Sequence, residues 1–471
     1  MYQIDFNKPH HIYFMGIGGI SMSGLAEILM DEGFTISGSD SKESELTEHL
    51  RSRGAFVSIG QRAENIAAAD EAGGAVDAVV YTAAIHPDNP EFQAAQQAGI
   101  PMMSRAVLLG EMMRNYKEAI AVSGTHGKTT TTSMLSEIFL AAKADPTISV
   151  GGILPSIGGN IRVGGPEFFI TEACEYTNSF LEFFPTMALI LNIEEDHLDF
   201  FKDLADIRRS FALFAEKVPA QGSVIINAEI ENWQEIVKNV SGTVITVGRD
   251  LACSYSAGSI TYDELARPSF ELYENGVRRD TISLGVGGEH NVYNALAAIA
   301  AALTAGVSME AVKRGLLNFT GTKRRFEKKG EFNGVTVIDD YAHHPQEIQA
   351  TLKTAGNYPH NQVWCVFQPH TYTRTKAFLN EFAEALSMAD RVILADIYAA
   401  RETDTLGISS RDIAERIEKL GTKEKLGTKV WYFPTFSEIE EFLKTNCQPG
   451  DLLITMGAGD IVTVGEELLS K

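Results

Sequence analysis

A glycine-rich stretch at residues 121–135, AVSGTHGKTTTTSML, has the residue types of a phosphate-binding loop. The residues with this chemistry are Gly124, Gly127, Lys128 and Thr129. They follow an apolar run, so they fall where a strand turns into a helix and backbone N–H groups can surround phosphates. Lys128 can neutralise phosphate charge, and the Thr129 hydroxyl can bind magnesium. The usual loop has one more glycine, at the position of Val122, and here His126 lies inside the turn. The stretch therefore predicts a nucleoside triphosphate site with a shortened loop.

Two later apolar runs lead to groups that bind cations. EFFITEACE reaches Glu172, and TMALILNIEEDHLD reaches Asp196 and His197. We expect these runs to be neighbouring strands of one sheet, because ligands of open α/β sheets bind beyond the carboxyl ends of strands. A carboxylate and an imidazole there could hold a metal near the γ-phosphate. Glu175 competes with Glu172 for the ligand role, and His197 could instead only cap a turn, so spacing leaves both choices open.

A third group of polar residues lies in DDYAHHP and QPHTYTRT, nearer the C-terminus. Arg374 offers a planar fork that captures a carboxylate through two hydrogen bonds. A helix beginning after Pro369 would point its positive end at the same place. The alternatives are that Arg374 belongs to a solvated first helical turn, and that His343 or His344 only caps the helix that Pro345 starts.

The N-terminal stretch HIYFMGIGGISMSGLAEILMDEGFTISGSD predicts a second phosphate site. It reads as a buried strand over Ile12–Met15, a glycine turn, a helix to about Glu32 and a second strand ending at Ser39-Asp40. The turn contains Gly16, Gly18 and Gly19. Ser21 stands where a dinucleotide fingerprint has its third glycine, although Asp40 has the expected spacing of a ribose-binding acid. A nucleotide or nucleotide-sugar site is favoured over an NAD site.

Short apolar runs alternate with helical patterns along nearly the whole chain, which indicates parallel α/β sheets. A chain of 471 residues suggests about three domains of roughly 150 residues each. We predict an α/β protein with a Rossmann-like N-terminal domain (residues 1–117), a central P-loop ATPase-like α/β domain (118–325) and a C-terminal Rossmann-like α/β domain (326–471).

The charge and the cysteine content restrict the partners and the cellular compartment that we expect for this chain. The net charge of −22 argues against nucleic acid or an anionic membrane surface as partner. Four cysteines form no C-x-x-C pair, which fits a reduced cytoplasm. We expect no signal peptide and no membrane span, because there is no basic region before an apolar stretch and no run of about 18 apolar residues.

The three groups of polar residues together favour an enzyme that joins two substrates at the expense of ATP. A hydride-transferring enzyme would not need the phosphate loop, and a motor ATPase would leave the first and third groups without a role. A binding protein would not need carboxylates, histidines and arginines at so many strand ends. A ligase would hold a nucleotide-like substrate in the first domain, ATP in the second and another reactant in the third.

Five stretches follow the order of the Mur ligase family: GTHGKTTT, NIEEDHLD, GEHNVYNALAA, GTKRRFE and DDYAHHP. The chain resembles that family over essentially its whole length, and the shortened loop resembles the family's own version. The histidine in GTHGK, with GIGGISMSGLAE, HHPQEI and QPHTYTRT, is similar to the member that adds L-alanine to UDP-N-acetylmuramate. EACEYTNSFL resembles the form found in low-GC Gram-positive bacteria.

The resemblance implies an ATP- and Mg²⁺-dependent ligase, with Mn²⁺ as an alternative metal, that forms an acyl phosphate before alanine attacks. It implies nucleotide contacts at Gly124, Thr125, His126, Gly127, Lys128, Thr129, Thr130, His290, Asn291, Asn294, Arg325 and Asp340. The implied metal ligands are Thr129, Glu172 and His197. The implied UDP-sugar contacts are Gly16, Gly18, Gly19, Ser21 and Asp40, and the implied alanine pocket is Tyr341, His343, His370 and Arg374. We assign catalysis to Lys128, His343 and Arg374.

One departure from the wider family concerns the second metal. Several relatives use a carbamylated lysine, but the corresponding stretch RRSFALFAE has Phe211 and Ala212 and no lysine. A second metal would depend on His197, substrate oxygens and water. The closest rival activity is that of the recycling ligase that attaches a whole tripeptide to the same UDP-sugar. We expect a monomer or weak homodimer.

Overall fold

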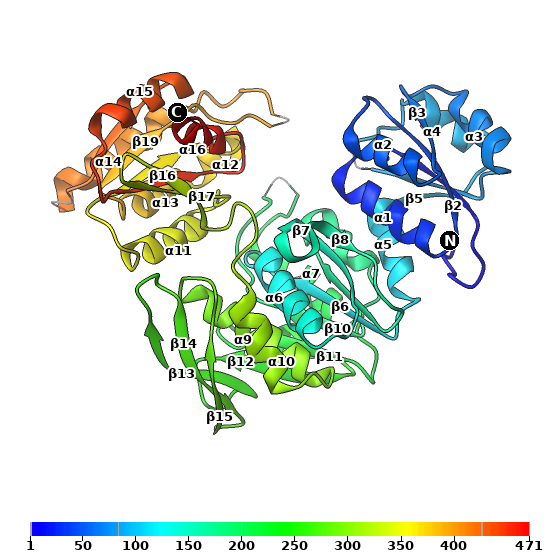
Figure 1. Ribbon diagram of the computed structural model, residues 1–471, viewed down its shortest axis with the longest axis horizontal. Coiled ribbons are helices and arrows are strands. Elements are labelled where there is room, and N and C mark those ends of the chain that lie inside the picture. Colours follow the sequence, from blue (N-terminus) through cyan, green and yellow to red (C-terminus); the bar gives the residue numbers. More distant parts are fainter. Residues whose placement is uncertain (1, 83, 199, 401, 425–426, 471) are drawn as a thin grey trace. The chain divides into compact units, whose positions relative to one another are not determined.

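The computed structural model describes residues 2–82, 84–198, 200–400, 402–424 and 427–470, and it contains three β-sheets with flanking helices (Figure 1). The chain divides into two compact units. One comprises Met1–Ser256, Tyr273–Val277 and Asn294–Gly315; the other comprises Ala257–Leu272, Arg278–Tyr293 and Leu316–Lys471. The predicted α/β fold class is confirmed. Among the described residues, no helix combines the length and apolar character needed to cross a membrane.

The first sheet is five-stranded and wholly parallel, with the order β3-β2-β1-β4-β5. Its strands are β1 (His11–Met15), β2 (Thr35–Asp40), β3 (Phe56–Ile59), β4 (Ala78–Tyr81) and β5 (Met102–Ser104). Its helices are α1 (Ile20–Asp31), α2 (Glu45–Ser52), α3 (Asn65–Gly73), α4 (Pro90–Gln97) and α5 (Arg105–Met113). The predicted strand, helix and second strand at the N-terminus are confirmed. Every residue of β1 is buried, since side chains of a central parallel strand are covered on both faces.

The second sheet has ten strands in the order β15-β14-β13-β12-β11-β10-β6-β9-β7-β8. The strands are β6 (Glu118–Ser123), β7 (Thr147–Leu154), β8 (Gly159–Arg162), β9 (Phe168–Glu172), β10 (Met187–Ile190), β11 (Ser223–Asn227), β12 (Thr243–Gly248), β13 (Tyr255–Tyr262), β14 (Pro268–Glu274) and β15 (Val277–Ser283). The helical segments are α6 (Lys128–Ala141), η1 (Pro155–Ile157), η2 (Tyr176–Glu182), α7 (Leu204–Ala215), α8 (Trp233–Ile236), α9 (His290–Thr304) and α10 (Met309–Asn318).

The order of this sheet corrects one expectation from the sequence. The strands that lead to Glu172 and His197, β9 and β10, are not neighbours, because β6 lies between them and pairs in parallel with both. The strand that feeds the phosphate loop is therefore central, and polar residues from both sides can approach the loop. His197 also lies in a loop well beyond the end of β10, with a positive φ of 53°.

The third sheet has the order β16-β17-β21-β18-β19-β20, with only β16 antiparallel among the paired strands. Its strands are β16 (Glu327–Phe332), β17 (Val335–Asp340), β18 (Val363–Phe367), β19 (Arg391–Leu394), β20 (Lys429–Tyr432) and β21 (Leu452–Met456). Its helices are α11 (Pro345–Gly356), α12 (Tyr372–Ala377), α13 (Leu379–Leu386), α14 (Ser410–Glu424), α15 (Phe436–Asn446) and α16 (Val462–Leu469).

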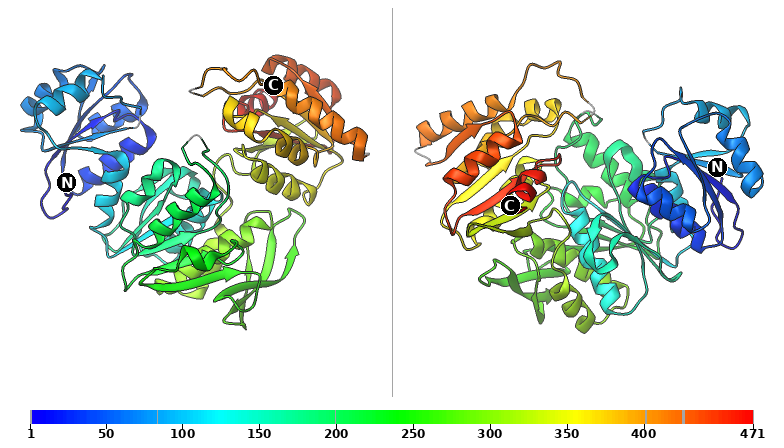
Figure 2. Two further views of the ribbon diagram at one scale, coloured as in Figure 1. Left: turned by 180° about the vertical axis from the view of Figure 1, so that it is seen from behind. Right: turned by 45° about the horizontal axis from the view of Figure 1, so that its top comes forward.

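Helices cover both faces of this third sheet (Figure 2). Cys365 and Phe367 of β18 pack with α13 on one face, while Trp364 and Val366 pack with α15 and α16 on the other. This alternation follows from the two-residue period of a strand. The ends of β17, β21 and β18 consequently meet at one edge, where the third group of polar residues lies.

Candidate active site

The phosphate loop connects β6 to α6 and has the conformation that its glycines allow. Gly127 has φ +83° and precedes the first residue of α6. A Cβ atom at Gly127 would lie 2.6 Å from the Asn294 side-chain oxygen, so a larger residue would meet both a strained backbone and a close neighbour. The first four backbone N–H groups of a helix lack intrahelical partners. The loop therefore presents donors and the positive end of α6 in the same place.

Asn192 holds the middle of the loop, a role that the sequence motifs did not predict. Its side-chain oxygen accepts a hydrogen bond from the His126 backbone N–H at 2.7 Å, and its side-chain nitrogen donates to the His126 carbonyl at 3.0 Å. The Glu194 backbone N–H donates to the Thr125 hydroxyl at 3.0 Å. Asn192 and Glu194 belong to the quoted NIEED motif, which was the available signal. The loop is thus fixed by the segment that follows β10.

Lys128 points back into the loop instead of into solvent. Its ammonium nitrogen donates to the Gly124 carbonyl at 2.6 Å and the Thr125 carbonyl at 3.1 Å. It also donates to the Glu175 carboxylate, at 3.0 Å and 3.2 Å for the two oxygens. Burial alone would lower the pKa of Lys128, but the opposing charge of Glu175 and other nearby groups raises it above its ordinary value. Lys128 therefore carries a firm positive charge at the end of the loop. Thr129 and Thr130 follow it in the first turn of α6 and are half-buried.

The two candidate carboxylates have different surroundings. Glu172, at the end of β9, accepts a hydrogen bond from the Gly151 backbone N–H at 2.5 Å. Glu175 is only 2% exposed and faces Lys128, and its Oε1 lies 3.9 Å from His197 Nε2. The structure thus brings Glu175, and not Glu172, together with both Lys128 and His197.

His197 is held by neighbours on two sides. Its ring stacks on Tyr176 with centroids 4.5 Å apart, and its backbone N–H donates to the Asp196 side chain at 2.8 Å. Asp199, which ends the DHLD motif, lies outside the described residues. Phe211, in the stretch RRSFALFAE where the sequence offers no lysine, is fully buried against Phe180 with ring centroids 5.3 Å apart. That position is part of the hydrophobic core and offers no ligand.

The glycine turn of the first sheet is stabilised by Asp40. The Asp40 carboxylate accepts a hydrogen bond from the Gly18 backbone N–H at 2.9 Å. A Cβ at Gly18 would lie 2.9 Å from the same carboxylate oxygen, so glycine permits the close approach. Gly16 has φ +81°, and Gly19 directly precedes α1. Ser21 is exposed in the first turn of that helix. Asp40 therefore shapes the glycine turn.

In the second unit, Asp340 ends β17 and is 6% exposed. Its carboxylate accepts backbone hydrogen bonds from Ala342 at 2.8 Å and Phe326 at 2.9 Å. Burial raises the pKa of Asp340 to about 6, although Arg325 and these hydrogen bonds act in the opposite direction. The guanidinium of Arg325 lies over the ring of Tyr341, 5.4 Å from its centroid. Asp340, Arg325 and Tyr341 thus lie close together.

The histidine pair in DDYAHHP has divided roles. His344 is the N-cap of α11, and its side chain accepts a hydrogen bond from the Gln346 backbone N–H at 3.5 Å. The ring of His343 instead lies 3.0 Å from the Tyr341 carbonyl and 3.3 Å from the Glu347 carboxylate. His344 is therefore the cap of α11, whereas the ring of His343 lies at the end of β17.

The end of β18 places His370 and Arg374 beside each other. An Arg374 guanidinium nitrogen lies 3.4 Å from His370 Nδ1. The His370 ring is 5.6 Å from that of His343 and stacks on Tyr398 at 5.8 Å. Tyr398 was missed because it follows β19 in an unremarkable stretch of sequence, and only the sheet order brings it to this edge. The four predicted pocket residues, Tyr341, His343, His370 and Arg374, form one group.

The remaining predicted nucleotide contacts are on α9. His290 is its first residue and is exposed; the Asn291 side chain donates to the Gly287 carbonyl at 2.7 Å. Asn294, one turn further on, belongs to the first unit and lies beside Gly127.

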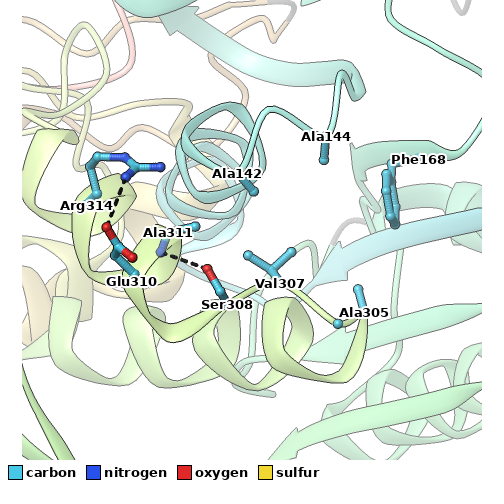
Figure 3. A pocket seen from close by; sticks show the side chains of 10 residues that line it. Ala142, Ala144, Phe168, Ala305, Val307, Ser308, Glu310, Ala311 and Arg314 are labelled. Carbon is cyan, nitrogen blue, oxygen red and sulfur yellow. Dashed lines mark hydrogen bonds and ion pairs between the residues drawn. The ribbon is translucent and has the colours of Figure 1, made fainter.

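A separate hollow in the first unit lies where α6 ends and α9 leads into α10 (Figure 3). It is lined mainly by small apolar side chains, with Glu310 and Arg314 3.8 Å apart at its edge. Ser308 accepts a hydrogen bond from the Ala311 backbone N–H at 3.3 Å. Its polar groups are paired with each other and with α6, since Arg314 also donates to the Ala141 carbonyl, so the phosphate loop remains the candidate site.

Three family models match this chain in succession. They are described as the Mur ligase family catalytic domain (residues 11–117), the Mur ligase middle domain (122–302) and the Mur ligase glutamate ligase domain (324–459). The chain therefore belongs to the Mur ligase family.

Curated relatives match along their full length. A UDP-N-acetylmuramate–L-alanine ligase of Lachnospira eligens is 63% identical over 470 residues, covering 100% of both chains. A protein of the same name from Agathobacter rectalis is 59% identical over 471 residues, again covering 100% of both. Among solved structures, the UDP-N-acetylmuramate-alanine ligase of Thermotoga maritima has a TM-score of 0.78 at 29% identity, covering 98% of each chain. A murein peptide ligase from Psychrobacter arcticus gives 0.67 at 26% identity, with the same coverage.

Proposed function

We propose that this protein joins L-alanine to the lactyl carboxylate of UDP-N-acetylmuramate, using ATP, in peptidoglycan synthesis. The products are UDP-N-acetylmuramoyl-L-alanine, ADP and phosphate. The observation that carries the proposal is the group of Lys128, Glu175 and His197 at the phosphate loop, in a chain 63% identical to a ligase of that name. Such a ligase acts in the cytoplasm, where ATP and UDP-sugars are available.

The reaction needs ATP because a carboxylate is a poor acyl donor whose leaving group would be oxide. Transfer of the γ-phosphoryl group to a lactyl oxygen gives an acyl phosphate and ADP. The alanine amine then attacks the acyl carbon, and the tetrahedral intermediate collapses with loss of phosphate and of a proton from nitrogen. Lys128 stabilises the charge on the transferred group, since a buried ammonium acts strongly where water is excluded.

The donor set at the loop fits a magnesium ion. The Thr129 hydroxyl, the Glu175 carboxylate and the His197 imidazole would hold it, and Glu175 replaces Glu172 in our assignment because it lies beside Lys128 and His197. Oxygen donors suit a hard cation, and the imidazole suits a less strictly octahedral site that also accepts Mn²⁺. When bound, the ion supplies positive charge to the phosphate oxygens.

The two other sites would hold the two substrates. The turn of Gly16, Gly18, Gly19 and Ser21, shaped by Asp40, offers backbone N–H groups and a helix N-terminus to the UDP diphosphate. The group of Tyr341, His343, His370 and Arg374 would receive L-alanine, with Arg374 on its carboxylate. The nucleotide would also contact Thr125, His126, Thr130, His290, Asn291, Asn294, Arg325 and Asp340.

The alternative is the recycling reaction, in which a tripeptide replaces L-alanine. Identity favours the main reading, because the murein peptide ligase structure is 26% identical whereas full-length alanine ligases reach 63%. The test is ATP turnover with UDP-N-acetylmuramate, measured with no amine, with L-alanine and with the tripeptide. We expect turnover that depends on L-alanine. Turnover with the tripeptide but not with L-alanine would establish the recycling activity. Equal turnover in the absence of any amine would contradict both proposals.

A further inference from the structure

Arg105 is the first residue of α5, directly after the end of β5. Its side chain is half-buried, yet among the described residues no hydrogen bond or ion pair engages its guanidinium. Arginine remains charged at all physiological pH values and has five N–H donors, so a half-buried guanidinium without a protein partner is costly unless a ligand completes it. Lys128, by contrast, is paired with Glu175.

Arg105 lies at the ligand-binding edge of the first sheet. Met15 of β1 pairs with Tyr81 of β4, and Tyr81 pairs with Ser104 of β5. Gly16 and Arg105 therefore leave the same edge of the sheet, two strands apart. Adjacent strands are about 4.8 Å apart, so the separation across the edge is roughly 10 Å. The glycine turn and Arg105 can contact different parts of one extended ligand.

The packing of α5 also brings Arg105 to the phosphate-loop end of the same unit. A Cβ at Gly110 would meet the Glu182 carbonyl oxygen at 2.0 Å, so α5 runs directly against η2. Directly after α5, the Arg114 guanidinium lies 3.5 Å from the centroid of the Phe184 ring. These two contacts show that the chain from Gly110 to Arg114 runs along the chain from Glu182 to Phe184, so α5 packs along the segment that follows Glu175.

Electrostatics support this placement. Burial lowers the pKa of the Arg105 guanidinium, and the Cys174 thiol opposes that effect, as expected for groups within electrostatic range. Cys174 is the residue before Glu175 and is influenced in turn by Lys128. Arg105 is thus within electrostatic range of the residue that precedes Glu175, and it is not part of the Lys128–Glu175 ion pair.

We propose that Arg105 binds the lactyl carboxylate of the UDP-sugar and holds it toward the phosphate loop. This inference rests on the proposed function. The diphosphate has its own donors at the glycine turn, whereas Arg105 begins the helix that packs on η2 and is within electrostatic range of Cys174, next to the Glu175 that pairs with Lys128. A guanidinium can hold a carboxylate by two parallel hydrogen bonds. It also offsets the repulsion between this anion and the γ-phosphate.

The test compares Arg105→Gln and Arg105→Lys with Arg114→Gln, a control at the C-cap of the same helix, where the arginine pairs with Glu111 at 3.3 Å. Calorimetry measures binding of UDP-N-acetylmuramate and of UDP-N-acetylglucosamine, which lacks the lactyl carboxylate. We expect Arg105→Gln to weaken UDP-N-acetylmuramate binding roughly 10- to 100-fold, with UDP-N-acetylglucosamine binding unchanged. Arg105→Lys should restore part of the loss, Arg114→Gln should bind both as the wild type does, and the KM for ATP should not change.

Two results would overturn the inference. Equal losses for both UDP-sugars in Arg105→Gln would place Arg105 on the diphosphate or in a structural role. Unchanged binding of both would show that the carboxylate does not reach it. Wild-type protein that binds no UDP-N-acetylmuramate would instead defeat the proposed function itself. ATP binding and melting temperature identify a variant that has not folded, and in that case Arg105→Lys, which keeps the charge and most of the length, decides.

Discussion

Both carboxylate oxygens of Glu175 lie within hydrogen-bond distance of the Lys128 ammonium nitrogen, at 3.0 and 3.2 Å. The pair occupies the position where the γ-phosphate and its metal are proposed to bind. ATP would therefore have to separate the two groups, with Lys128 turning to phosphate oxygens and Glu175 to the cation. Each side of the pair can be tested separately.

Glu175→Gln should raise the magnesium concentration needed for half-maximal activity, because removal of one anionic ligand weakens binding of a hard cation. Glu172→Gln is the matched control, since its carboxylate binds the Gly151 backbone N–H instead of Lys128. Steady-state ligation across a magnesium titration measures both. A shift confined to Glu172→Gln would return the ligand role to that residue.

Lys128→Ala should abolish ligation while UDP-N-acetylmuramate binding stays close to that of the wild type. Loss of one group that stabilises the transferred phosphoryl typically costs on the order of a hundredfold or more in rate. Lys117→Ala is a suitable control because that side chain is 72% exposed and pairs with Glu167 at the surface. Equal loss of UDP-sugar affinity and activity in Lys128→Ala would contradict the assignment of the two ligands to separate sites.

The phosphate loop could be predicted from the sequence because its signal is local: a buried strand, a glycine turn and a lysine at the start of a helix. The choice between Glu172 and Glu175 is not local. It depends on β6 lying between β9 and β10 and on the turn between β9 and η2, which places Glu175 beside Lys128. The sequence offered both residues and no means of ranking them.

Contacts between residues that follow different strands also could not be predicted from the sequence motifs. Asn192 reaches the loop from the segment after β10, and Tyr398 reaches His370 from the segment after β19. Which of His343 and His344 caps α11 depends on the residue at which that helix begins. The two adjacent positions differ there only in backbone conformation. The residue types at the strand ends therefore predicted which kinds of site the protein has. The order of the strands determines which residues belong to each site.

From the raised pKa of Asp340 we predict that the free energy of unfolding decreases as the pH rises. Its folded-state pKa of about 6 lies above the ordinary value for an aspartate, so the folded state holds the proton more tightly. Its stabilising contribution is complete below about pH 4 and is lost as the pH rises through about 6. Between pH 8 and pH 5 the difference is on the order of 1–2 kcal/mol.

Urea unfolding at these two pH values, followed by the fluorescence of Trp364 and Trp431 in the same domain, measures this contribution. Asp340→Asn should reduce the pH-dependent difference by about that amount, and Asp404→Asn, at an exposed loop position, should leave it unchanged. An identical pH difference in wild type and Asp340→Asn would show that Asp340 does not titrate in this range.

Arg374→Ala should damage the second half of the reaction and spare the first. Its guanidinium is proposed to hold the carboxylate of free L-alanine, which takes no part in forming the acyl phosphate. A charge-assisted hydrogen bond contributes roughly 1.5–3 kcal/mol, so the KM for alanine should rise on the order of 10- to 100-fold.

Hydroxylamine separates the two halves, because it attacks an acyl phosphate without needing a carboxylate pocket. With ATP and UDP-N-acetylmuramate, Arg374→Ala should still form the hydroxamate at a rate near that of the wild type. Arg391→Ala is a control at the start of β19, where the arginine donates to the Asp390 carbonyl at 3.0 Å, and both reactions should persist there. If hydroxamate formation in Arg374→Ala falls as far as alanine ligation does, Arg374 serves the phosphoryl step. In that case the alanine carboxylate must bind to a cation other than Arg374.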